Sequence, residues 1–171
     1  AVDEDWTKSR QYGITGVPTF VAEILSEHTE YEMDLTPYEV MIVATETDSY
    51  NALAVNNFVP EMGRLNLYQT AIHTGDPSDF HASLSGRTLF GDDWNIHELE
   101  WKSEQGYAMR KTQITEQFTY EQFRAQSIEG TIPLFVIRAQ GKLEFFTSGN
   151  GVEPKTGDAV VSFSPPEHQE M

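Results

Sequence analysis

The chain has 171 residues, with 27 Asp and Glu against 11 Lys and Arg, 5 His and no Cys, and its formal charge is −16. This length suits one ordinary domain or two small ones, and it is enough to form a core without a disulfide or a structural metal. The charge argues against nucleic-acid binding and against direct binding to anionic lipid, because both partners are negative. The absence of Cys excludes disulfides, thiolate metal sites and cysteine nucleophiles.

No stretch of the sequence is long enough to span a membrane. The longest apolar runs, 40–44 and 132–137, have five and six residues, whereas a transmembrane helix needs about 20. The first residues are acidic where a secretory signal is cationic. We therefore expect a cytoplasmic module, and its start in the middle of a structural pattern suggests a fragment of a longer protein.

The first part of the chain, up to residue 72, alternates short apolar runs with helical stretches. Strands are predicted over residues 16–22, 39–44 and 65–69. Helices are predicted over residues 26–33 and 48–62, and Gly63 is expected to end the second. Strands that alternate with helices are typical of a parallel sheet built from right-handed crossovers.

A polar segment, 73–86, is predicted to link this part to a second, α+β part over residues 87–166. Strands are predicted there over residues 107–114, 132–138, 142–147 and 159–163. Helices are predicted over 94–103, with Asp93 as the N-cap, and over 119–126, where Thr119 opens a capping box. The tail, 167–171, is expected to be disordered.

Residues 42–54 contain the pattern A-T-x-x-D-x-x-N-x-L-A. This segment resembles the nucleotide-binding RCK (regulator of potassium conductance, TrkA-type) domains of bacterial cation transporters. Further segments are similar to the cytosolic tail of bacterial sodium(potassium)/proton antiporters, at residues 22–27, 86–91, 132–137 and 154–158. The resemblance extends from about Val2 to Pro166.

The resemblance implies both a fold and a function. The fold is α/β, with an incomplete Rossmann-like parallel sheet over residues 1–72, followed by a smaller RCK-C-like α+β subdomain. The function is that of a regulatory, ligand-sensing module on the cytoplasmic side of the inner membrane, which couples ligand or ion binding to monovalent cation/proton exchange. The implied partners are a second copy, forming a homodimer, and the transmembrane transporter domain of the same parent chain. No residue is placed as a nucleophile or general base, so we expect no enzyme activity and no catalytic residue.

The phosphate-binding turn of a Rossmann half is absent from this sequence. Such a half opens with G-x-G-x-x-G, whose glycines let a pyrophosphate approach a helix N-terminus, and no such pattern occurs here. By the resemblance, residues 2–5 match the end of the family's second strand, where Asp3 aligns with an acid that binds a ribose hydroxyl. We therefore expect no cofactor for this chain alone, and NAD(H) or an adenine nucleotide only in a complete parent domain.

The candidate ligand-binding residues are Asp3, Glu23, Thr45, Thr47 and Asp48. The last four lie at or just past the C-terminal ends of predicted strands, where open α/β sheets bind ligands. Structural alternatives remain open for all of them. Thr47 or Asp48 would cap the helix, and Asn51 would satisfy a loop carbonyl. Asp3 and Glu23 would be solvated acids.

Two sets of possible metal ligands can be composed from the sequence, Glu27, His28 and Glu32, or Asp92, Asp93 and His97. Neither set has a third ligand at a spacing that a metal site requires, so no metal site is expected. Two other functions stay open. One is a fragment of a nucleotide-dependent, dehydrogenase-like soluble enzyme, which needs a glycine turn upstream and a proton-transfer residue. The other is a stand-alone adaptor that docks on a transporter.

Overall fold

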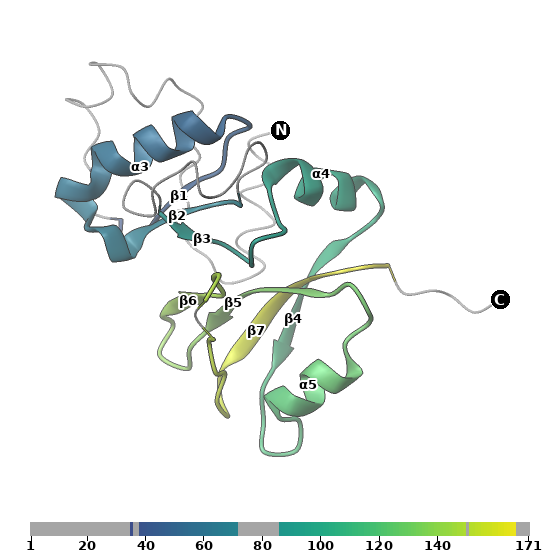
Figure 1. Cartoon of the computed structure of the whole chain (residues 1–171). Helices are drawn as coiled ribbons and strands as arrows, with labels where there is room; N and C mark the ends of the chain where they lie inside the picture. The colour runs from purple at the N-terminus through teal and green to yellow at the C-terminus, as the bar shows by residue number, and fades with distance from the viewer. Residues whose placement is uncertain (1–34, 36–37, 72–85, 150, 167–171) are drawn as a thin grey trace. The chain divides into compact units, whose positions relative to one another are not determined.

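The computed structural model describes residues 35, 38–71, 86–149 and 151–166. These residues form an α/β structure with one parallel sheet of three strands and one antiparallel sheet of four (Figure 1). The predictions for residues 1–34, for most of the linker and for the tail lie outside the described residues. No helix within the described ranges is long and apolar enough to cross a lipid bilayer.

The parallel sheet has the strand order β1-β2-β3. Its strands are β1 (Met41–Val43), β2 (Leu67–Gln69) and β3 (Arg87–Thr88). Helix α3 (Asp48–Met62) and the short 3-10 helix η1 (Arg64–Asn66) connect β1 to β2. Because β1 and β2 pair in parallel across this helical connection, the predicted α/β character of the first part is confirmed.

Helix α3 packs beside β1 and β2 (Figure 1). Its buried apolar side chains recur every three or four residues, at Ala52, Val55, Phe58 and Met62, which is the spacing of one helix face. Gly63 ends the helix with a φ of 74°, and its N–H donates to the carbonyl of Val59 at 2.9 Å. The predicted helix over residues 48–62 is therefore confirmed, together with its glycine end.

Strand β3 adds a third strand that the apolar pattern did not indicate. Arg87 pairs with Tyr68, and Thr88 pairs with Gln69. The side chain of Gln69 extends this pairing, because its Oε1 accepts the N–H of Gly86 at 3.0 Å. The parallel sheet thus includes residues that follow the predicted linker.

The antiparallel sheet has the order β4-β7-β5-β6. Its strands are β4 (Ala108–Gln113), β5 (Ile132–Ile137), β6 (Leu143–Phe145) and β7 (Ala159–Ser164). All six residues of β7 are buried, as befits a central strand. The four predicted strands of the second part are confirmed within one or two residues at each end.

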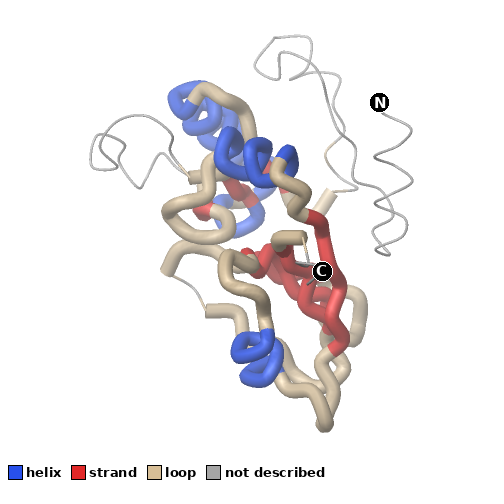
Figure 2. The backbone as a smooth tube through the Cα atoms, turned by 90° about the vertical axis from the view of Figure 1, so that its right-hand side faces the viewer, coloured by secondary structure: helices blue, strands red, loops and turns tan. Residues whose placement is uncertain are grey.

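Two helices accompany this part of the chain, α4 (Ile96–Glu104) and α5 (Tyr120–Gln126). In both views α5 lies alongside the antiparallel sheet (Figure 1 and Figure 2). Phe123 of α5 joins a buried cluster with Val136 of β5 and Val160 of β7. This cluster is the core between α5 and one face of the sheet.

Of the two helix caps predicted in this part of the chain, one is confirmed and the other is wrong. At α5 the Thr119 hydroxyl accepts the Gln122 N–H at 3.3 Å, and the Gln122 side chain accepts the Thr119 N–H at 2.8 Å, so the capping box is confirmed. At α4 the cap is Asn95, whose Oδ1 accepts the Glu98 N–H at 3.0 Å, so Asp93 as the N-cap is wrong. The helix starts later because the Asn95 side chain, and not that of Asp93, accepts a free N–H of the first turn. The Trp94 carbonyl lies before the helix and accepts the Ala71 N–H at 3.2 Å.

One segment, residues 87–90, hydrogen-bonds to both sheets, and we call it the shared segment. On one side the Leu89 N–H donates to the Gln69 carbonyl at 2.8 Å, next to the β2–β3 pairing. On the other side the Phe90 N–H donates to the Phe146 carbonyl, and the Thr88 carbonyl accepts the Ser148 N–H, each at 2.9 Å. The two sheets are therefore connected through backbone hydrogen bonds of a single segment.

We predict that Leu89→Ala lowers the free energy of unfolding by about 2–5 kcal/mol, because it leaves a cavity at a fully buried position. Leu89 is 1% exposed, whereas Leu65 is 76% exposed. Leu65→Ala is therefore the matched control, with an expected change within about 0.5 kcal/mol. Urea unfolding followed by circular dichroism measures both. Equal losses in the two variants would mean that the shared segment contributes nothing to the core.

Candidate functional site

The C-terminal end of β1 continues directly into α3, and we call residues 44–48 the strand-end turn. Three of the predicted ligand-binding residues, Thr45, Thr47 and Asp48, lie in this turn. The other two, Asp3 and Glu23, lie outside the described residues. The structure thus brings three of the five residues together at the carboxyl end of a parallel strand, the place where such sheets bind ligands.

Asn51 shapes the strand-end turn from the first turn of α3. Its side chain is buried, and its Oδ1 accepts both the Thr45 N–H at 3.0 Å and the Thr45 hydroxyl at 2.6 Å. Its Nδ2 donates to the Thr45 carbonyl at 3.0 Å. The Thr45 hydroxyl also accepts the Thr47 N–H at 3.3 Å. Thr45 and Asn51 therefore hold the turn itself, which is the structural alternative considered for Asn51.

Thr47 and Asp48 occupy the start of α3. Thr47 is the N-cap by position, with extended backbone, but its side chain makes no capping hydrogen bond. Asp48 lies in the first turn, where the helix dipole stabilises a carboxylate by about 0.3–1 kcal/mol. The exposed hydroxyl of Thr47 is thus not used for capping, and together with the Asp48 carboxylate it is the part of the predicted site best placed to meet a ligand.

The strand-end turn also brings an acid next to helix α4. Ligand atoms of Glu46, His97 and Glu100 lie within 4.8 Å of one another. His97 and Glu100 are three residues apart and share a face of α4. One imidazole and two carboxylates are ligands that could hold a divalent cation. In the sequence His97 lies near Asp92 and Asp93, which suggests those two acids as fellow ligands, whereas Glu46 is remote. The expectation of no metal site stays a prediction.

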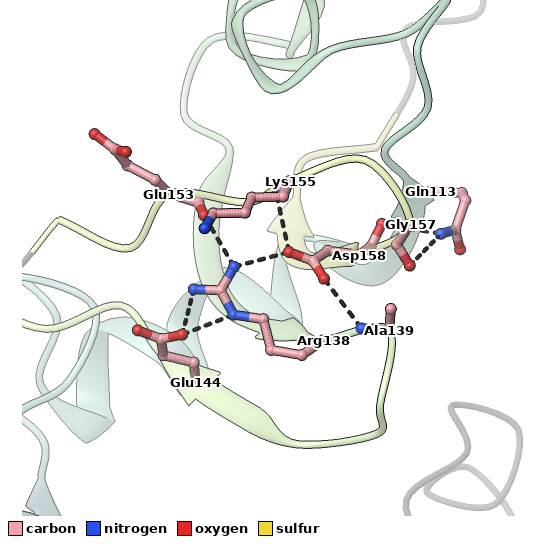
Figure 3. Close-up of polar contacts among 8 residues, drawn as sticks. All are labelled: Gln113, Arg138, Ala139, Glu144, Glu153, Lys155, Gly157 and Asp158. Carbon is pink, nitrogen blue, oxygen red and sulfur yellow. Dashed lines mark hydrogen bonds and ion pairs between the residues drawn. The ribbon is translucent and has the colours of Figure 1, made fainter.

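The most connected polar group of the antiparallel sheet is centred on Arg138, at the end of β5 (Figure 3). Its Nη1 donates to Asp158 Oδ2 at 2.7 Å, and its Nε donates to Glu144 Oε2 at 2.7 Å. Arg138 Nη1 also donates to the carbonyl of Glu153 at 2.9 Å. The guanidinium therefore ties together β5, β6 and the start of β7.

Asp158 is the buried member of this group. Its carboxylate also accepts the backbone N–H of Lys155 at 2.8 Å and of Ala139 at 3.0 Å (Figure 3). Burial by itself raises the pKa of Asp158, but the hydrogen bonds from Lys155, Arg138 and Ala139 outweigh it and hold the pKa below its usual range. For Arg138 burial alone lowers the pKa, while hydrogen bonds to Asp158 and Glu144 raise it above its usual value. Both groups are charged at neutral pH, and their bonds are to the chain itself, so the pair is structural.

No sequence signal indicated this pair, because Arg138 and Asp158 meet only through strand pairing. Ile137 of β5 lies opposite Ala159 of β7, and this register places the next residues, Arg138 and Asp158, side by side. An acid directly before the last strand and an arginine directly after an apolar strand are common in any sequence, so the pattern by itself is not specific.

Comparisons of the chain with protein-family models and with curated protein sequences find no match.

We predict that Asp158→Asn lowers the free energy of unfolding by about 2–3 kcal/mol, because it leaves the guanidinium of Arg138, whose side chain is 16% exposed, without its buried counter-charge. The side chain of Glu144 is 45% exposed, against 6% for Asp158. Glu144→Gln is therefore the matched control, with an expected loss below about 1 kcal/mol. Urea unfolding at neutral pH compares them. A loss from Asp158→Asn no larger than that of the control would contradict the structural role.

The contribution of Asp158 should also depend on pH. The pKa of this carboxyl is lowered in the folded chain, while in the unfolded chain it is about 3.9. Its stabilisation is then complete above about pH 5 and is lost as the pH falls through the folded pKa. The difference in unfolding free energy between the parent chain and Asp158→Asn should accordingly shrink on acidification. A difference that stays constant down to about pH 2 would exclude a contribution from the carboxylate charge.

Proposed function

We propose that this chain belongs to the cytosolic regulatory module of a monovalent cation/proton antiporter, where it couples the binding of a ligand or ion to transport. The observation that carries the proposal is the pattern A-T-x-x-D-x-x-N-x-L-A, which here forms the strand-end turn and the first turns of α3. In the proposed fold, β1, α3 and β2 are part of an incomplete Rossmann-like half, and the antiparallel sheet with α5 is an RCK-C-like subdomain.

The residues of this pattern have physical roles that fit a binding turn. Thr45 and Asn51 hold the turn by three hydrogen bonds to each other, while Ala54 is 0% exposed and lets α3 pack on the sheet. Asp48 is the aspartate of the pattern, and it lies in the first turn of α3. The pattern therefore combines a rigid support with polar groups at a strand end, which favours ligand binding at Thr47 and Asp48.

For ligand binding to affect transport, binding at the strand-end turn must change the arrangement of the rest of the chain. The shared segment supplies a connection, because its backbone bonds to β2 on one side and to residues 146–148 on the other. A ligand that binds one arrangement of the module better than another shifts the population by its difference in affinity and by no more. The proposed assembly is a homodimer on the cytoplasmic side of the membrane, and the exposed Leu53 and Leu65 are apolar side chains that a second copy can cover.

The proposal is tested in the parent protein. The gene upstream of Ala1 should encode about ten apolar helices of about 20 residues each. In everted membrane vesicles, Thr47→Val with Asp48→Asn should abolish the response of cation/proton exchange to cytosolic ions or ligands, because it removes the Thr47 hydroxyl and the Asp48 charge and leaves the support of the turn intact. Ser49→Ala, a change at the exposed second residue of α3, is the control and should leave the response unchanged.

Two results would count against the proposal. If the part of the same gene before Ala1 encodes a soluble catalytic domain, the alternative of a nucleotide-dependent enzyme replaces the proposal. If the double variant regulates exchange as the parent does, the strand-end turn is not the sensing site.

A further inference from the structure

A cavity of about 230 Å³ opens beside the antiparallel sheet, and we call it the β4–β7 cavity. Its walls come from β4, β7, α5 and the loop over residues 127–131. None of the strand-end turn residues lines it. The cavity is therefore a separate feature from the candidate site described above.

Strand register places polar side chains on the wall formed by the sheet. Arg110 of β4 lies opposite Ser162 of β7, and Ala108 lies opposite Ser164. Alternate residues of a strand point to the same face, so Arg110 and Thr112 share the face of Ser162 and Ser164, and these four line the cavity. Farther along β7 the same face is occupied by Val160 and belongs to the apolar core under α5.

The two serines on this face are buried. Ser162 is 1% and Ser164 is 5% exposed, and their hydroxyl oxygens are 3.1 Å apart. One hydroxyl donates its proton to the other. The second hydroxyl then still has its own proton to donate to another group. Burying such hydroxyls is unfavourable unless they gain a partner. A ligand oxygen in the cavity would supply an acceptor at this position.

The charge of the cavity is opposite to that of the protein. Arg110 is the one charged side chain among the described residues that line it, in a chain whose net charge is −16. A guanidinium binds a carboxylate or a phosphate through two parallel N–H donors. The opposite wall carries the apolar Phe118, Phe123 and Ile128 together with the polar Gln126, Ser127 and Thr131. The volume is below the range of about 300–1,000 Å³ typical of drug-sized ligands, so it suits a small molecule.

We propose that the β4–β7 cavity binds a small organic oxyanion, with Arg110 as the charge partner, Ser162 and Ser164 as hydrogen-bonding groups, and the aromatic wall against a short carbon chain. The shared chemistry is a negatively charged oxygen group, which a carboxylic acid or a phosphate ester can supply. Binding at this cavity is a property of the chain and does not depend on the proposed regulation of a transporter.

The proposal is tested by NMR titration of the full chain with propionate, with glycerol phosphate and with inorganic phosphate, at low ionic strength. We expect saturable shifts of the amides of β4 and β7 with a Kd of about 1 mM or lower for at least one organic probe. Tighter binding of propionate identifies a carboxylate ligand, and tighter binding of glycerol phosphate identifies a phosphate ester. Inorganic phosphate should bind more weakly than glycerol phosphate, because it lacks the carbon chain.

Variants separate the cavity from general electrostatics. Arg110→Met should weaken binding at least about tenfold, because it removes the charge and both donors. Lys111→Met is the matched control, since Lys111 is exposed on the opposite face of β4, and it should leave the Kd unchanged. If Arg110→Met does not fold, Arg110→Lys and Ser162→Ala take its place, and each should weaken binding severalfold. Absence of saturable shifts up to about 10 mM, or equal affinity in the Arg110 and Lys111 variants, would overturn the proposal.

Discussion

Backbone hydrogen bonding on both sides of residues 87–90 is the constraint on which the described structure depends. A strand carries donors and acceptors on two edges, and burying either edge without partners is costly. Here one edge bonds to β2, and the other bonds to residues 146–148. Leu89, at the centre of the segment, is 1% exposed and forms a bridge with Thr147. One backbone segment therefore joins the parallel sheet to the residues that directly follow β6.

The polar groups of the protein divide into those that build it and those that can meet a ligand. Asn51 and Asp158 are buried, Arg138 is partly buried, and all three are bonded to the chain through several atoms each. Such groups stabilise one backbone arrangement, because loss of a partner leaves a buried donor, acceptor or charge unsatisfied. Thr47 is exposed at the strand-end turn, and Arg110 lines the β4–β7 cavity. In the proposed function the first class supplies the rigid support and the second class supplies recognition.

The sequence by itself determined the elements whose signals lie within one helical turn or one strand. Helix α3 begins at Asp48 and ends at Gly63 as predicted, because its buried stripe and its terminating glycine are local features. The capping box at Thr119 formed for the same reason, since both of its hydrogen bonds join residues three apart. The four strands of the second sheet followed from short apolar runs, and the position of Thr45, Thr47 and Asp48 at a strand end followed from the order of strand and helix.

Only the tertiary structure decided the features that depend on residues far apart in the sequence. Strand β3 forms at a polar segment because β2 and residues 146–148 offer it hydrogen-bonding partners. Arg138 meets Asp158 through the register of β5 and β7, and Arg110 meets Ser162 through that of β4 and β7. The physical reason is the same in each case: strand pairing and loop closure bring together groups whose separation along the chain carries no local signal.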